Sequence, residues 1–226
     1  VEALRSGWQQ DPVASETIPL RTLLEIHKQY PNIKLRLMNL STSASISMLE
    51  KSSSKPMASV SWWHLVADQS TVTSSDIGIR VSPSLGCSKD RKALIEALLR
   101  KTITGVSVHS IALDDTETKK PPAERIPGLS GYGLVLPALW QELIENSKWS
   151  IEELWEAISF GPSKILSLPP EELKIGSNRW LLFDPNKKWI HTNKYLEKDS
   201  CKVVSNEPWE GREITGQVID CGLISN

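Results

Sequence analysis

The strongest constraint on the fold is an alternation of extended and helical segments through the first half of the chain. Extended stretches are predicted at residues 34–40, 57–63, 79–81 and 104–111, because their apolar residues alternate with polar ones or form short buried runs. Amphipathic helices are predicted at residues 16–30, around 46–49, and at 90–101 with Ser88 as the cap. Strand-then-helix repeats favour parallel strands in an α/β layer or barrel.

The second half of the chain has a different pattern. Residues 114–127 are polar, contain three prolines and show no period, so they are predicted to form a long loop. Helices are predicted at residues 134–145 and 151–160, with a short one from 162, and short strands follow from 176, on either side of a turn at Asp184-Pro185-Asn186. We therefore expect an α/β part over residues 1–170 and a small β appendage over 171–226.

Composition excludes several functional classes. The 226 residues carry 27 acidic and 26 basic side chains, which leaves no basic surface for a nucleic-acid partner. The longest apolar runs, such as residues 132–140, have about half of the roughly 20 residues that cross a bilayer. Three cysteines without a C-x-x-C spacing argue against a disulfide framework and favour a cytoplasmic location. The start at Val1, without a leader, predicts a fragment or a processed product.

Several phrases share one order and spacing along the chain. They are PVASET at 12–17, LST at 40–42, ASVSWWHL at 58–65, VSPSLG at 81–86 with DRKAL at 90–94, PGLSG at 127–131, LLFDP at 181–185 and WEGREITG at 209–216. Together they resemble the dihydroorotases of the amidohydrolase superfamily, particularly the cyanobacterial-type branch. The resemblance implies the C-terminal half of a TIM-type (β/α)8 barrel, strands five to eight, followed by a small C-terminal β-sandwich segment.

The resemblance also implies where metal ligands belong. Dihydroorotases open a cyclic amide with one or two zinc ions that activate water and polarise the carbonyl. Their ligands follow the barrel strands: a His-x-His after the first, a carboxylated Lys or an Asp after the fourth, one His each after the fifth and sixth, and an Asp after the eighth that also serves as the general base. The first two groups would lie upstream of Val1.

The remaining ligand positions are mostly substituted. Asn39 occupies the fifth-strand His position, with Arg36 at a neighbouring position that is often His as well. His64 matches the sixth-strand ligand, whereas His109 replaces the eighth-strand Asp. An arginine stays protonated and cannot ligate zinc, and an amide is a poor substitute for imidazole. Two further positions, a substrate-facing His and a Glu in the family, are Leu113 and Gly133.

We therefore predict a dihydroorotase-like protein without catalytic residues and without a required cofactor. Asn39, Ser82 and His109 are the substrate-facing candidates, and His64 is the metal candidate. The resemblance suggests protein partners: the chain's own N-terminal half, a second copy, or aspartate transcarbamoylase by analogy with related dihydroorotases. The alternative is the C-terminal part of a zinc amidohydrolase that converts dihydroorotate to carbamoyl aspartate. A gene-model product without a separate role is a third hypothesis.

Other interpretations of the same residues stay open at this point. His64 and His109 are candidates for a new metal site with Cys87 or Asp114, and Ser110 with His109 and Asp114 for a hydrolase triad without the usual G-x-S-x-G turn. The acidic residues between 114 and 117 are either paired carboxylates or a solvated loop. Residues 119–122 suit a peptide-binding strip or a stiff loop. The tryptophans at 62, 63, 140, 149 and 155 suit a core or a partner surface.

Overall fold

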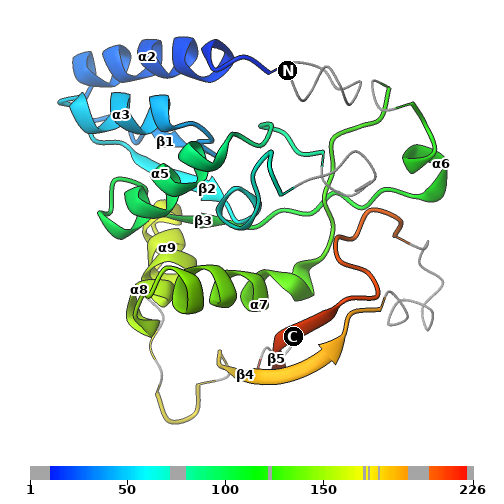
Figure 1. Cartoon of the computed structure of the whole chain (residues 1–226). Helices are drawn as coiled ribbons and strands as arrows, with labels where there is room; N and C mark the ends of the chain where they lie inside the picture. The colour runs from blue at the N-terminus through cyan, green and yellow to red at the C-terminus, as the bar shows by residue number, and fades with distance from the viewer. Residues whose placement is uncertain are drawn as a thin grey trace.

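The centre of the fold is a sheet of three parallel strands (Figure 1). The computed structural model describes residues 11–71, 80–121, 124–169, 172, 174–177, 179–192 and 204–222. The strands are β1 (Arg36–Leu37), β2 (Met57–Ser61) and β3 (Gly105–Ser107), in the order β1-β2-β3. Leu37 pairs with Ala58, and Val60 pairs with Val106. The predicted parallel α/β arrangement is found, with shorter strands than the patterns suggested.

Helices alternate with the strands as the sequence predicts. They are α2 (Ala14–Gln29), α3 (Ser43–Lys51), α4 (Trp63–Val66) and α5 (Ser88–Leu99). Helix α2 precedes β1, α3 lies between β1 and β2, and α4 and α5 lie between β2 and β3. The strand predicted at 57–63 ends at Ser61, and helix α4 begins at Trp63. The cap of α5 is Cys87 and not Ser88, because Asp90 accepts a hydrogen bond from the backbone N–H of Cys87 at 3.0 Å.

One predicted strand is not found. Ile79 lies outside the described residues, and Arg80 and Val81 belong to no strand. The carbonyl of Arg80 instead accepts a hydrogen bond from the N–H of Gly128 at 2.7 Å. Since β2 pairs directly with β3, no strand lies between them, and the described sheet has three strands where four were predicted.

The chain beyond β3 is mainly helical. A short helix α6 (Asp115–Thr118) interrupts the loop predicted at 114–127. The helices that follow are η2 (Tyr132–Leu134), α7 (Val135–Leu139), η3 (Trp140–Asn146), α8 (Ile151–Trp155), η4 (Glu156–Phe160) and α9 (Gly161–Leu166), of which η3 and η4 are π-helical. Gly161 lets α9 pack against the start of β3: a Cβ there would lie 1.9 Å from the carbonyl oxygen of Thr104.

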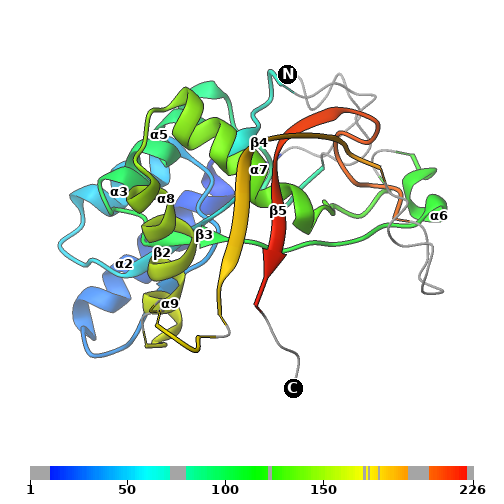
Figure 2. The same ribbon diagram turned by 90° about the horizontal axis from the view of Figure 1, so that it is seen from below.

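The C-terminal part forms a two-stranded antiparallel sheet beside α7 (Figure 2). Strand β4 (Leu181–Ile190) pairs with β5 (Glu213–Cys221). The turn predicted at Asp184-Pro185-Asn186 lies inside β4, where the register shifts between Asp184 and Lys188. Phe183 packs on Trp140 with ring centroids 5.2 Å apart, which ties the sheet to the helices. In the described residues the expected β-sandwich segment is this single pair of strands.

The core lies between the sheet and its helices. Trp62, Trp63 and Trp149 are buried in it, whereas Trp140 and Trp155 are partly buried. Most of the tryptophans at the five positions therefore serve packing. Within the described ranges, no helix combines the length and apolarity that a bilayer crossing requires. The largest fully buried apolar side chains are Trp62, Trp63, Leu49, Leu65, Leu94, Ile103, Leu134, Leu139, Leu143 and Leu154.

Candidate functional site

The predicted site residues follow the carboxyl ends of the three parallel strands. Asn39 comes two residues after β1, His64 lies in α4 directly after β2, and His109 comes two residues after β3. Parallel strands end at one edge of a sheet, which is where barrel enzymes place their reactive groups. The fold therefore brings these positions to one end of the sheet.

A small cavity at this edge brings three of the four predicted residues together. His64, Ser82 and His109 all line it, and its volume is about 50 Å³. Asn39 does not line it. The other residues around the cavity are Ser61, Trp63, Val81, Ile111, Pro127, Gly128 and Leu129. One water needs roughly 10–15 Å³ of such space, so the cavity accommodates a few water-sized groups.

His64 is the most enclosed polar side chain of the cavity. It is only 3% exposed, and its Nε2 donates to the carbonyl oxygen of Ser84 at 3.3 Å. Because a carbonyl oxygen only accepts, Nε2 carries the proton and Nδ1 keeps the lone pair. No described residue hydrogen-bonds to Nδ1. Burial lowers the pKa of His64, although the backbone of Ser84 and Pro83 opposes this in part. The imidazole is therefore a neutral acceptor at neutral pH.

Trp63 is a second cavity residue with an unmatched polar atom. Its Nε1 is buried and no described residue accepts its hydrogen bond. The indole packs between Trp62 and Trp209, with ring centroids 5.2 and 5.5 Å away. Among the described residues, one donor and one acceptor thus lack partners on two adjacent side chains that line the same cavity. No sequence pattern could single out Trp63 for this property, because burial of its nitrogen depends on distant residues.

Asn39 is held by structural contacts. Its φ of +58° is left-handed, a conformation that asparagine tolerates better than most residues. Its Oδ1 accepts a hydrogen bond from Ser107 Oγ, and its backbone N–H donates to Ser59 Oγ at 3.2 Å. The neighbouring Arg36 donates to Ser167 Oγ at 3.1 Å. The amide therefore joins the ends of β1 and β3.

Of the remaining substituted positions, only His109 brings a polar side chain to the cavity. His109 lines it but is exposed. Leu113 is buried and hydrophobic, and Gly133 is exposed, with no atom within 4 Å of the point that a Cβ on its backbone would occupy. Ser82, also exposed, completes the rim.

The donor set does not fit a catalytic zinc site. Such a site takes three protein ligands plus water, and the described part of the chain contains no group of three His, Cys, Asp or Glu side chains placed to hold a metal ion. Cys87 donates its thiol to Asp90 Oδ2 at 3.1 Å, and Asp114 caps α6 by accepting from the N–H of Glu117. Both residues that were candidates to complete a two-histidine site are thus used in helix caps.

Two carboxylates hold the segment that follows β1. Glu16 accepts from the backbone N–H groups of Ser41 and Thr42 at 3.0 and 3.2 Å, and from both hydroxyls. Asp90 accepts from the N–H and hydroxyl of Ser43 at 2.8 and 2.7 Å. Burial raises the pKa of Asp90, but the bonds from Ser43 and Cys87 outweigh it, so the net pKa is lowered. Carboxylates at the start of α3 also suit the helix dipole.

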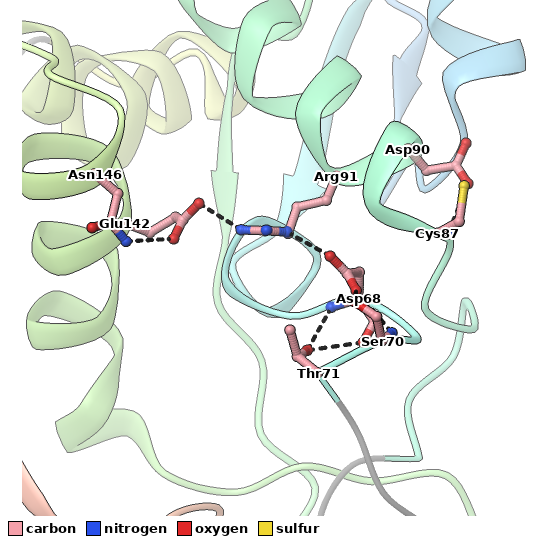
Figure 3. A network of polar contacts seen from close by, with 8 residues as sticks. All are labelled: Asp68, Ser70, Thr71, Cys87, Asp90, Arg91, Glu142 and Asn146. Carbon is pink, nitrogen blue, oxygen red and sulfur yellow. Dashed lines mark hydrogen bonds and ion pairs between the residues drawn. The ribbon is translucent and has the colours of Figure 1, made fainter.

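A further network anchors the loop that follows α4 (Figure 3). The buried Asp68 accepts from Ser70 N–H at 2.8 Å and from Arg91 Nε at 2.9 Å, and Arg91 also pairs with Glu142 at 2.5 Å. Burial raises the pKa of Asp68, and the bonds from Ser70 and Arg91 lower it further than burial raises it. The sequence gives no local signal of this network, because Arg91 is separated from its two acidic partners by 23 and 51 residues.

Comparison with known proteins gives the chain a family. No family model matches it. It is 32% identical over 228 residues to the probable dihydroorotase-like protein of Synechocystis sp., covering 96% of this chain and 49% of that protein. It is 28% identical over 218 residues to the dihydroorotase of Carboxydothermus hydrogenoformans, covering 93% of this chain and 49% of that protein.

Solved structures agree on the fold. The dihydropyrimidinase from Brevibacillus agri superposes with a TM-score of 0.76 at 16% identity, over 96% of this chain and 50% of that one. The dihydroorotase from Saccharomyces cerevisiae superposes with a TM-score of 0.71 at 15% identity, over 93% of this chain and 58% of that one. The fold is therefore part of an amidohydrolase-type barrel. The sequence matches go further: the chain belongs to the dihydroorotase-like proteins and spans about half the length of the curated relatives it matches.

Proposed function

We propose that the chain is a non-catalytic dihydroorotase-like protein that acts as a scaffold or regulatory partner linked to pyrimidine biosynthesis. The observation that carries the proposal is the donor set at the strand ends. It combines one buried imidazole, His64, with an Asn39 amide that is bonded to Ser107 and an exposed His109. Hydrolysis of a cyclic amide needs a metal-activated water, and one enclosed imidazole is too little to hold that metal. A cytoplasmic location belongs to the same proposal.

The experiment that tests the loss of catalysis measures bound zinc and dihydroorotate turnover on the purified protein. We expect far less than one zinc per chain and no turnover above background. His64→Gln is the matched variant, and we expect it to leave both quantities unchanged. Stoichiometric zinc that disappears in His64→Gln, together with measurable turnover, would overturn the proposal.

The same assay decides between this proposal and a second candidate. In the second candidate, the chain is the C-terminal part of a zinc amidohydrolase that hydrolyses dihydroorotate to carbamoyl aspartate. The observation that favours it is the lone pair on His64 Nδ1, which no described residue engages and which is the kind of donor that zinc uses. Ligands supplied by another barrel half would have to complete the site.

The proposal also includes a protein partner for the chain. We propose that the chain supplies one side of the barrel and pairs with its own N-terminal half or a second copy, or binds aspartate transcarbamoylase by family analogy. In the described residues β1 and β3 each pair only with β2, so each has an outer edge without a strand. Next to β1 in the chain, α2 exposes Ile18 at 67% and Ile26 at 45%. Apolar surface of this kind commonly marks an interface.

Sedimentation velocity tests the partner proposal. We expect the 25.2 kDa chain to self-associate or to co-sediment with aspartate transcarbamoylase. The double variant Ile18→Glu and Ile26→Glu is expected to weaken that association, whereas the control Arg21→Glu, also exposed on α2, leaves it intact. A 25.2 kDa species at every concentration that ignores aspartate transcarbamoylase would contradict the proposal.

A further inference from the structure

A second hollow lies where the α/β part meets the C-terminal sheet. It is lined by Val66 of α4, by Pro137 and its neighbours in α7 and η3, and by residues from Trp209 into the first part of β5, which lies beside α7 (Figure 2). We call it the junction hollow. Its volume is about 330 Å³, and small-molecule sites, which are common at such junctions, occupy roughly 300–1,000 Å³. Its size and its place in the fold therefore suit a small ligand.

The floor of the junction hollow is apolar. Val66, Pro137 and Ala138 line it from the helices, and Ile214 lines it from β5. Pro137 and Ala138 are buried and the other two are partly buried, so the surrounding packing holds this surface in place. Covering such an apolar surface with an apolar group removes it from water, which favours binding.

Trp209 adds an aromatic ring in a fixed position. Its φ is +64°, a left-handed value that residues other than glycine rarely adopt, and its carbonyl accepts from the N–H of Arg212 at 3.0 Å. Its partly buried ring packs on Trp63, with the centroids 5.5 Å apart. Since Trp209 and Arg212 belong to one tight turn and both line the hollow, an aromatic surface and a cation lie close together there.

The charges around the junction hollow leave one cation without an acidic partner. The carboxylate of Glu142 points toward Arg91 and pairs with it (Figure 3), and Glu213 pairs with Lys188 at 3.0 Å. The exposed guanidinium of Arg212 has no acidic partner among the described residues. The hollow is therefore suited to an anion, and the planar guanidinium matches the two oxygens of a carboxylate.

We propose that the junction hollow binds a small aromatic carboxylate. The carboxylate pairs with Arg212, and the aromatic body packs against Trp209 and the apolar floor. Gln141 and Thr215, both exposed on the rim, offer further hydrogen bonds. The site is separate from the cavity at the strand ends, with which it shares no lining residue.

Three probes test the two halves of this recognition: phenylacetate, its uncharged analogue phenylacetamide, and acetate. NMR spectra of the whole chain follow the amides of Val66 and Ile214 during each titration, with the Leu40 amide in the parallel sheet as control. We expect saturable binding of phenylacetate, about tenfold tighter than that of phenylacetamide, because bonds between ionised groups are stronger than neutral ones. Acetate, which has no aromatic body, should give no saturable shift, and Leu40 should not move.

Variants separate the charge from the shape of the hollow. Arg212→Gln should weaken phenylacetate about tenfold, to the affinity of phenylacetamide, and leave phenylacetamide unchanged. Lys187→Gln removes an exposed cation of β4 that does not line the hollow, so it should change neither affinity. Thr215→Trp fills the rim and should weaken both probes. If a variant does not fold, the three probes on the wild type decide alone.

Several results would overturn the site: no saturable binding of phenylacetate, equal affinities for phenylacetate and phenylacetamide, acetate that binds as tightly as phenylacetate, or shifts that leave Val66 and Ile214 unmoved. Zinc and dihydroorotate turnover play no part in this readout. Bound zinc with turnover would therefore remove the proposed function and leave this site standing, whereas a failed titration removes the site alone.

Discussion

The polar side chains that follow β1 and those that follow β2 differ in whether their hydrogen bonds are satisfied. At the end of β1 the polar groups are engaged: Asn39 is bonded to Ser107, and the segment at 41–43 is held by two carboxylates. Directly after β2, His64 Nδ1 and Trp63 Nε1 are buried without partners among the described residues. Asn39 therefore has a structural role after β1, whereas the residues after β2 keep polar atoms that no described residue engages.

The variant with the largest expected effect removes Glu16, the carboxylate that binds the backbone after β1. Glu16→Ala takes away a carboxylate that accepts from two N–H groups and two hydroxyls. Bonds to charged acceptors contribute roughly 1.5–3 kcal/mol each and overlap when they share one carboxylate, so we expect a loss of about 3 kcal/mol in the free energy of unfolding. Urea denaturation measures it. Glu25→Ala, exposed on the same helix, serves as control and should change stability by less than about 0.5 kcal/mol.

Asp90, the second carboxylate that binds this segment, makes the free energy of unfolding depend on pH. Asp90→Asn should cost about 2 kcal/mol at neutral pH, because the amide cannot accept from Ser43 and Cys87 as the carboxylate does. The pKa of Asp90 is lowered from 3.8, so its contribution is complete above pH 3.8 and is lost as pH falls through the lowered value. Denaturation of both proteins between pH 2 and 7 checks this. A difference that stays constant below pH 3 would refute the role of the charge.

Two variants of Asn39 distinguish a structural role of this residue from a role as a metal ligand. Asn39→Ala removes the acceptor of Ser107 and places a non-asparagine side chain at positive φ, so we expect a loss of about 1.5 kcal/mol. Asn39→His introduces the imidazole that the family resemblance implies for this position, yet we expect no stoichiometric zinc because residue 39 does not line the cavity that His64 and His109 share. Calorimetry measures the first effect and elemental analysis the second. Tight zinc in Asn39→His would show that only one substitution separates this site from a metal centre.

The smallest effect is expected at the end of β2. His64→Leu loses the bond to Ser84 but also removes the unmatched Nδ1, so it should cost about 0.5–1 kcal/mol at pH 8. Burial lowers the pKa of His64 below 6.5, which means that the wild type loses stability as pH falls below 6.5. The variant lacks this dependence, so the difference between the two proteins should shrink in acid. Thermal unfolding at pH 5, 6, 7 and 8 measures it; a difference that grows in acid would be the contrary result.

Much of the fold was predictable because it follows from the local periodicity of apolar residues. Helices α2 and α5 and strand β2 lie where periodicity placed them, since each buries a regular apolar face or run. The strand predicted at 79–81 is not found at Arg80 and Val81, because two apolar residues on either side of an arginine also suit a loop. The turn predicted at Asp184-Pro185-Asn186 lies where the pairing of β4 with β5 is interrupted, and the N–H of Asn186 donates to Asp184 Oδ1 at 2.9 Å.

The sequence by itself determined the alternation of strands and helices and the family resemblance, which implies that Asn39 and His109 stand at ligand positions. These depend on residue type and spacing alone. Only the tertiary structure decided that Asn39 is tied to Ser107, that Trp63 and His64 keep atoms unmatched by any described residue, and that Trp209 and Arg212 line one hollow with α7. Hydrogen bonding and burial are set by groups far apart in the chain, so no local pattern can report whether a polar atom has found a partner.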